Sequence, residues 1–230
     1  MIRYSLIKEK FPREFLLLQG TGCRWGKCTF CDYHTDTGAD PFQINEHVLK
    51  QVTGEYGVLD IINSGSCTEL DEETLNLISE VIRNKSIRTV WFEAHWMYRN
   101  ELPSFARRFP EAEVKFRTGA ESFDPELRTA LKKGISESVT AEDIAAHFQG
   151  VCLLACISGQ TKDTVSNDIK LASEHFEYFS INIFNENSTD IKRDDSAAEW
   201  LIKTWHETLK DNPKAELLVL NTDLGVGDSI

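Results

Sequence analysis

The sequence lacks any apolar run that approaches the roughly 20 residues a membrane-spanning helix needs. Its first segment, Met1 to Lys8, also lacks the apolar core of a signal peptide. Linkers, low-complexity tracts and short repeats are missing as well. We therefore expect a cytoplasmic protein, without a membrane span, that folds as a single domain over residues 1–230.

Positive charge is scarce, because 25 Lys and Arg stand against 37 Asp and Glu and give a net charge of −12. Binding to bulk DNA or RNA needs a basic surface that neutralises phosphates, so this balance argues against such a partner. A small-molecule substrate fits the composition better, although the count leaves room for a local basic patch. The 41% hydrophobic content is ordinary for a globular protein.

The six cysteines lack the even dispersal of a disulfide scaffold, which favours metal binding in a reducing compartment. Three of them, Cys23, Cys28 and Cys31, follow the spacing C-x4-C-x2-C in a glycine-rich stretch. Glycine adopts positive φ without steric cost, so this stretch can fold tightly around a metal group.

Four interpretations of this spacing stay open. The three thiolates could hold a [4Fe–4S] cluster and leave its fourth iron open. A [2Fe–2S] cluster would need a fourth cysteine, for which Cys67 is available. A structural zinc would also need a fourth ligand, for which His34 is available. The thiols could finally be ordinary buried side chains.

Apolar stretches alternate with helical patterns along the chain, which indicates parallel βαβ units. The expected strands are residues 15–19, 57–62, 87–93, 113–117, 151–157 and 178–184. The expected helices lie near 45–52, from 71 onward, near 100–109, over 125–134, from 140, over 163–176 and up to 212. Six such units predict an α/β fold, a partial (βα)6 TIM-type barrel, with its chemistry at the carboxyl ends of the strands.

Polar residues follow the third expected strand. Glu93 ends an otherwise apolar run, which suits a side chain that faces a polar cavity, a helix cap or an ion pair. His95 could be a proton donor, a hydrogen-bond partner of a substrate or a structural histidine. We take Glu93 and His95 as the candidate catalytic residues. Lys132 and Lys133 are expected on a solvated helix face.

The cysteine loop after the first strand, together with segments at four other strand ends, resembles the radical S-adenosylmethionine (SAM) superfamily. That family usually spaces its cysteines C-x3-C-x2-C, so the extra residue between Cys23 and Cys28 is a departure. The resemblance implies a radical SAM core with two cofactors, a [4Fe–4S] cluster and SAM. It also implies an external electron donor such as flavodoxin or ferredoxin.

The resemblance places cofactor contacts at particular strand ends. Phe30 and Ile157 would contact the adenine, and Ser64-Gly65-Ser66 would bind the SAM amino group, although the usual second glycine and Glu-Pro are missing. Arg117 would bind the SAM carboxylate, unless it pairs with Glu93 or Glu121. The expected cofactor-binding residues are Phe30, Tyr33, Ser64, Gly65, Ser66, Arg117, Glu121, Ser122, Ile157 and Gln160.

Within the superfamily, the run from Gln19 to His34 and the short chain are similar to the queuine lyase family. This similarity implies cleavage of the C–N bond of queuine to release the deazaguanine preQ1. The expected substrate contacts are Asn182, Asn185, Glu186 and Asp223, with Glu93 as a further carboxylate that could read the deazaguanine edge. The alternatives are another deazapurine or modified nucleobase as substrate, and a non-catalytic iron–sulfur electron carrier.

Overall fold

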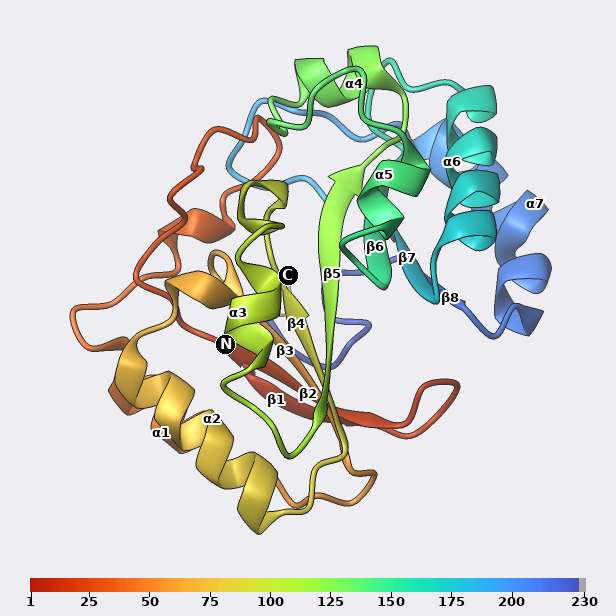
Figure 1. The fold of residues 1–230 in the computed structure, drawn as a ribbon. Helices are drawn as coiled ribbons and strands as arrows, with labels where there is room; N and C mark the ends of the chain where they lie inside the picture. The colour runs from red at the N-terminus through yellow and green to blue at the C-terminus, as the bar shows by residue number, and fades with distance from the viewer. Residues whose placement is uncertain (228–230) are drawn as a thin grey trace. The chain divides into compact units, whose positions relative to one another are not determined.

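The computed structural model describes residues 1–227, and its strands form one sheet in the order β1 to β8 (Figure 1). The strands are β1 (Tyr4–Ile7), β2 (Arg13–Leu18), β3 (Val58–Asn63), β4 (Thr89–Glu93), β5 (Glu113–Glu121), β6 (Gly150–Ala155), β7 (Tyr178–Ile183) and β8 (Ala215–Leu218). The helices are α1 (Pro41–Leu49), α2 (Glu72–Asn84), α3 (Leu102–Ala106), α4 (Pro125–Ala130), α5 (Ala141–Ala145), α6 (Lys162–His175) and α7 (Asp195–Asp211). Short 3-10 turns are η1 (Tyr33–Thr35), η2 (Cys67–Glu69) and η3 (Trp96–Tyr98).

The predicted α/β fold is confirmed, and its strand order is that of a partial TIM-type barrel. The six expected strands are β2 to β7, and β8 continues the series as a further parallel strand beside β7. Sequence analysis missed β1, which pairs antiparallel with β2. Four half-buried residues are too short a pattern to identify such a strand.

The chain divides into two compact units, which are described separately. Unit 1 holds residues 1–26, 33–116 and 221 onward, and unit 2 holds residues 27–32 and 117–220. Cys23 therefore belongs to unit 1, and Cys28 and Cys31 belong to unit 2. The single domain over 1–230 stays a prediction, and its last three residues lie outside the described part of the chain.

In unit 1, β3 pairs parallel with β2 and with β4. A buried ion pair joins β2 and β3, with Arg13 Nε 2.8 Å from Asp60 Oδ2. The helices α1 and α2 lie side by side (Figure 1). Ile2 and Gly227 exchange two backbone hydrogen bonds of 2.9 and 2.7 Å, so the last described residues close onto the segment before β1.

The first helix begins four residues earlier than the expected start near residue 45. Asp40 caps α1 by accepting a hydrogen bond from the Gln43 N–H, and Pro41 occupies the first helical position. Asn45 is fully buried inside this helix, where its carboxamide bonds both backbone groups of Gln19. Residues 41–44, which lie before the expected start, therefore belong to the helix.

In unit 2, β5, β6, β7 and β8 pair parallel in that order. Leu131, Leu154, Ile157 and Phe184 form an apolar cluster in this unit. Phe30 of the cysteine loop packs against the cluster.

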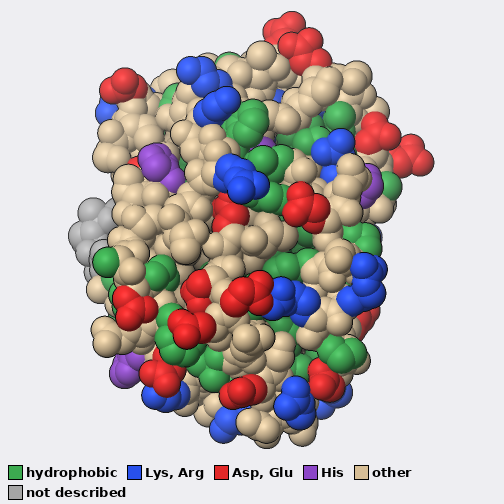
Figure 2. Space-filling model, turned by 60° about the vertical axis from the view of Figure 1, so that its left-hand side comes forward, with side chains coloured by type: hydrophobic (Ala, Val, Ile, Leu, Met, Phe, Trp, Pro, Cys, Tyr) green, Lys and Arg blue, Asp and Glu red, His purple; other side chains and the backbone are tan. Residues whose placement is uncertain are grey.

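Charged side chains of both signs lie interspersed over the face shown in Figure 2. No helix among residues 1–227 is long and apolar enough to cross a membrane.

A buried carboxylate on α6 supports the end of β5 in unit 2. Asp168 accepts hydrogen bonds from the Ser122 hydroxyl and the Phe123 N–H, each at 2.7 Å. Burial nevertheless raises the pKa of Asp168 to about 6, because it disfavours the ionised form. The folded state thus binds more protons than the unfolded chain between about pH 4 and pH 6.

Asp168 should make the protein less stable as the pH rises through this range. The stabilising contribution of the protonated form is present below the unfolded pKa and is lost above about pH 6, a change on the order of 3 kcal/mol. Asp168→Asn should remove this slope from the free energy of unfolding, measured by urea titration across the range. Glu174→Gln, on an exposed position of the same helix, should keep the wild-type slope; an unchanged slope in Asp168→Asn would contradict the assignment.

Candidate active site

The first part of the cysteine loop lies in unit 1 and is held by groups that follow β3. The Gly20 N–H donates to Ser64 Oγ at 2.7 Å. The Thr21 hydroxyl donates to the Glu69 carbonyl at 3.1 Å, and the Arg24 N–H donates to Glu69 Oε1 at 2.9 Å. Residues outside the loop therefore fix its path on both sides of Cys23.

Cys23 is half-buried and free of a disulfide. Its sulfur accepts a hydrogen bond from the Gly26 N–H at 3.4 Å. Gly26 has φ of 51°, a left-handed conformation that most side chains disfavour. The thiol is thus set in a tight turn that supplies its own backbone donor.

The segment expected to bind the SAM amino group directs its hydroxyls to the protein. Ser64 Oγ accepts from Gly20, and Ser66 Oγ accepts from the His95 N–H at 3.0 Å. A Cβ at Gly65 would overlap Glu69 Oε2 and lie 2.9 Å from the Gly22 carbonyl oxygen. Only glycine fits there, because the Glu69 carboxylate and the backbone of the cysteine loop occupy the space of a side chain.

Glu93 and His95 lie at the end of β4 and at the start of η3 in unit 1. Glu93 is half-buried. The His95 ring stacks on Trp25 of the cysteine loop, with ring centres 5.0 Å apart. His95 Nδ1 accepts the Met97 N–H at 3.2 Å, which places the proton of the neutral ring on Nε2.

The second part of the cysteine loop belongs to unit 2. Cys28 and Cys31 are half-buried and free of disulfides, and the Cys31 N–H donates to the Cys28 carbonyl at 3.4 Å. Phe30 packs against the cluster that contains Ile157. The two apolar residues expected to contact adenine are therefore brought together.

A residue of the segment after β7 holds this part of the loop on both sides of Cys31. Asn187 Nδ2 donates to the Phe30 carbonyl at 2.8 Å and to Asp32 Oδ1 at 3.3 Å. The backbone N–H and hydroxyl of Ser188 donate to Asp32 Oδ2 at 3.1 and 2.9 Å. We call Asn187, Ser188 and Asp32 the Asn187 clasp.

The end of β5 carries a buried ion pair. Glu121 has a left-handed φ of 66°, and its Oε1 lies 2.9 Å from Lys133 Nζ, with both side chains at most 10% exposed. Lys133 Nζ also lies 5.6 Å from the centre of the Phe30 ring. The expectation that Lys133 lies on a solvated face is wrong, because this carboxylate draws it inward.

Arg117 and Ser122, at β5 and directly after it, were expected to bind the cofactor, and both expectations need revision. Arg117 does not end the strand, because β5 continues to Glu121. Arg117 pairs with Gly150, the first residue of β6, and is buried 5.9 Å from the centre of the Tyr178 ring. This position is at the starting end of β6 and β7, so the geometric basis for a contact with SAM is lost. Ser122 is fully buried, and its hydroxyl donates a hydrogen bond to Asp168.

The end of β6 is braced by Gln160. Its Oε1 accepts the Cys156 N–H at 2.8 Å, and its Nε2 donates to the Leu154 carbonyl at 3.2 Å. Cys156 itself has a left-handed φ of 65°. The Gln160 side chain thus holds a strained strand end beside Ile157.

The expected substrate contacts are only partly brought together. Asn182, near the end of β7, is half-buried. Asn185 donates to the Ile183 and Val219 carbonyls, and Glu186 pairs with Lys192 at 3.1 Å on the surface. Asp223 is exposed in a turn of unit 1. Tyr33, an expected cofactor contact, is 55% exposed in η1.

Cys67, the alternative fourth ligand, is fully buried in η2, and burial raises the pKa of its thiol. This environment suits a core residue better than a thiolate. Within residues 1–227, no three His, Cys, Asp or Glu side chains converge to hold a single metal ion. A cubane cluster takes one thiolate per iron, so its ligands do not need to converge on one ion.

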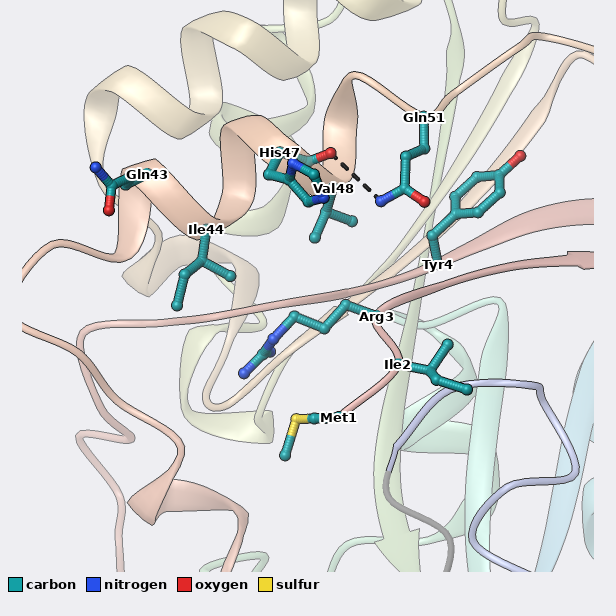
Figure 3. Close-up of a pocket in the computed structure, with 9 residues that line it drawn as sticks. All are labelled: Met1, Ile2, Arg3, Tyr4, Gln43, Ile44, His47, Val48 and Gln51. Carbon is teal, nitrogen blue, oxygen red and sulfur yellow. Dashed lines mark hydrogen bonds between the residues drawn. The ribbon is translucent and has the colours of Figure 1, made fainter.

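A separate pocket of about 400 Å³ lies between β1 and α1 in unit 1 (Figure 3). Arg3 lines it and pairs with Asp36 at 2.7 Å, and Gln51 donates to the His47 carbonyl at 3.3 Å. None of the expected site residues lines this pocket.

Three residues hold the candidate site in roles that were not predicted from the sequence, among them Asn187, which was expected as a possible contact of substrate hydroxyls. These are Glu69, Lys133 and Asn187. Glu69 had a sequence signal, because Ser66-Cys-Thr-Glu69 has the S-x-x-E spacing of a capping box. Lys133 and Asn187 had none that separates them from surface or turn residues.

Comparison with solved structures gives a close match over the whole chain. The chain is similar to a queuine lyase from Clostridium spiroforme bound to SAM and queuine, with 41% sequence identity and a TM-score of 0.94. The match covers 99% of this chain and 100% of the other. No family model matches the chain, and no curated protein matches it either.

The Asn187 clasp gives a direct prediction for the loop. Asn187→Ala removes two hydrogen bonds beside Cys31. This should lower the free energy needed to open the loop locally by about 1 to 2 kcal/mol. Amide hydrogen exchange over residues 28–32 should therefore become about tenfold faster. Glu186→Gln in the same segment has no hydrogen bond to the clasp and should leave this exchange unchanged. Equal exchange in Asn187→Ala and wild type would show that the clasp does not hold the loop.

Proposed function

The chain belongs to the queuine lyase family of radical SAM enzymes, and we propose that it cleaves the C–N bond of queuine to release preQ1. The observation that carries this proposal is the 41% identity, over nearly all of both chains, to a queuine lyase whose structure holds SAM and queuine. The substrate is thus a small nucleobase, which an acidic protein can accept.

Cys23, Cys28 and Cys31 would hold the [4Fe–4S] cluster. These three thiols fit a cluster, since all of them are half-buried and form no disulfide. Cys23 Sγ also accepts a hydrogen bond from a backbone N–H. Hydrogen bonds to cysteine sulfur are among the features that tune such clusters. When bound, the reduced cluster would supply the electron that breaks a carbon–sulfur bond at the sulfonium of SAM.

Residues at the ends of β3, β5 and β6, together with Phe30, would bind and orient SAM. Phe30 and Ile157 offer an apolar surface for the adenine, and the backbone of the Ser64–Ser66 segment, which lies against the loop at Cys23, would bind the amino group. Glu121 is a buried carboxylate that is paired with Lys133 and can accept hydrogen bonds from the ribose hydroxyls. Lys133 offsets the cost of burying that charge.

Glu93 and His95 are the proposed catalytic residues. The Met97 N–H occupies His95 Nδ1, so the ring can offer its Nε2 proton to a substrate atom. Glu93 is the proposed partner for the donor edge of the deazaguanine, because it is half-buried at the end of β4 beside His95, whereas Asp223 is exposed and Glu186 lies on the surface. Asn182 is the remaining candidate near the end of β7. An electron donor such as flavodoxin or ferredoxin and a cytoplasmic location complete the proposal.

The cofactor part is tested without queuine. Anaerobic reconstitution should give about four irons per chain, and reduction in the presence of SAM should give 5′-deoxyadenosine. Cys28→Ala should abolish both, whereas Cys152→Ala should keep both, since Cys152 lies within β6. Two irons per chain, with Cys67 required, would instead support a ferredoxin-type electron carrier.

The substrate part is tested by adding queuine and SAM to the reduced holoenzyme. Formation of preQ1, followed by mass spectrometry, is the expected result. Glu93→Gln should lower kcat/KM for queuine by about 100-fold if it reads the donor edge, while leaving SAM binding intact. A reconstituted enzyme that cleaves SAM but releases no preQ1 would redirect the search to another deazapurine or modified nucleobase.

A further inference from the structure

We propose that Glu69 is a positioning residue, which fixes Cys23 of the cysteine loop relative to the Ser64–Ser66 segment. The inference rests on the proposed function only in taking this loop as the cluster-binding loop. It concerns a carboxylate that touches neither the proposed substrate contacts nor a cysteine sulfur in any hydrogen bond described above.

The Glu69 carboxylate gathers three donors from three segments of unit 1. Oε1 accepts the Arg24 N–H at 2.9 Å and the Tyr98 hydroxyl at 2.7 Å. Oε2 accepts the Ser66 N–H at 2.7 Å. One side chain thus joins the residue after Cys23, the segment after β3 and the turn η3.

The backbone of Glu69 adds a fourth contact, because its carbonyl accepts the Thr21 hydroxyl at 3.1 Å. Glu69 therefore holds the loop two residues before Cys23 and one residue after it. Such a bracket limits the movement of the intervening thiol without a bond to the sulfur itself.

The bracket depends on close approach of two backbones. A Cβ at Gly65 would lie 3.4 Å from Cys23 Cα and 2.9 Å from the Gly22 carbonyl oxygen. The loop around Cys23 and the segment proposed to bind the SAM amino group are thus in near contact. Glu69 bonds both, so a shift of its carboxylate would move one relative to the other.

The chemistry of the donors favours a carboxylate over an amide. Burial and the neighbouring Glu69 charge raise the pKa of Tyr98, so its phenol stays a donor. The two other donors are backbone N–H groups, which cannot reverse their role. A glutamine would offer one acceptor oxygen and would direct its NH2 group toward a donor.

The experiment compares iron retention in reconstituted wild type, Glu69→Gln and Tyr98→Phe. We expect Glu69→Gln to lose iron to a chelator about tenfold faster and to bind SAM about tenfold more weakly, in line with residues that support metal ligands from behind. Tyr98→Phe removes one of the three donors and should show a smaller effect in the same direction. The change that SAM causes in the electron paramagnetic resonance signal of the reduced cluster should weaken in the same order.

Glu72→Gln is the matched control, because Glu72 is an exposed glutamate three residues away that pairs with Arg108. It should match wild type in every measurement. Thermal unfolding of the variants before reconstitution separates positioning from general destabilisation, since Tyr98→Phe should unfold only slightly below the wild-type temperature, remain folded under the assay conditions and still retain iron less well.

Wild-type iron retention, SAM affinity and resonance change in Glu69→Gln would overturn the proposal. So would a Tyr98→Phe variant that matches wild type while Glu69→Gln fails to fold. Queuine is absent from these assays, so a failure to form preQ1 would leave the role of Glu69 standing. A wild-type protein that takes up no iron would overturn both proposals.

Discussion

A glycine-rich loop that carries three thiols cannot fix their positions through its own backbone hydrogen bonds. Between Gly20 and Asp32 the chain forms neither strand nor helix, so most of its polar groups need partners outside the loop. In unit 1 Ser64 and Glu69 are such partners, and in unit 2 Asn187, Ser188 and the Leu131 carbonyl are. The path of the loop that carries the three cysteines therefore depends on side chains from other parts of the chain.

The fold was largely predictable because parallel strands that are buried on both faces have a simple pattern. The strands β2, β3, β6 and β7 are mostly apolar, and their sequence signal does not depend on the rest of the chain. The end of β5 was not predictable. The expected strand stopped at Arg117, yet β5 runs through Thr118 and Gly119 to Glu121, so Arg117 does not lie at the strand end where it was expected.

The candidate site was predictable in its apolar part and much less so in its polar parts, while the assignment of the three cysteines to a cluster stays a prediction. Phe30 and Ile157 belong together because apolar side chains near one strand end share the same core. Polar residues at strand ends have two competing uses. Ser66, Gln160 and Asn185 satisfy backbone groups that the ending strands leave unpaired, and the sequence alone does not separate this use from ligand binding.

The bridge between Ile2 and Gly227 has a consequence for biosynthesis. Unit 1 pairs Ile2 with Gly227, so this pairing has to wait until the ribosome has released Gly227. Contacts of such high sequence separation form late, because they close a large loop. The nascent chain must therefore carry the backbone of Ile2 without this pairing until Gly227 has been made.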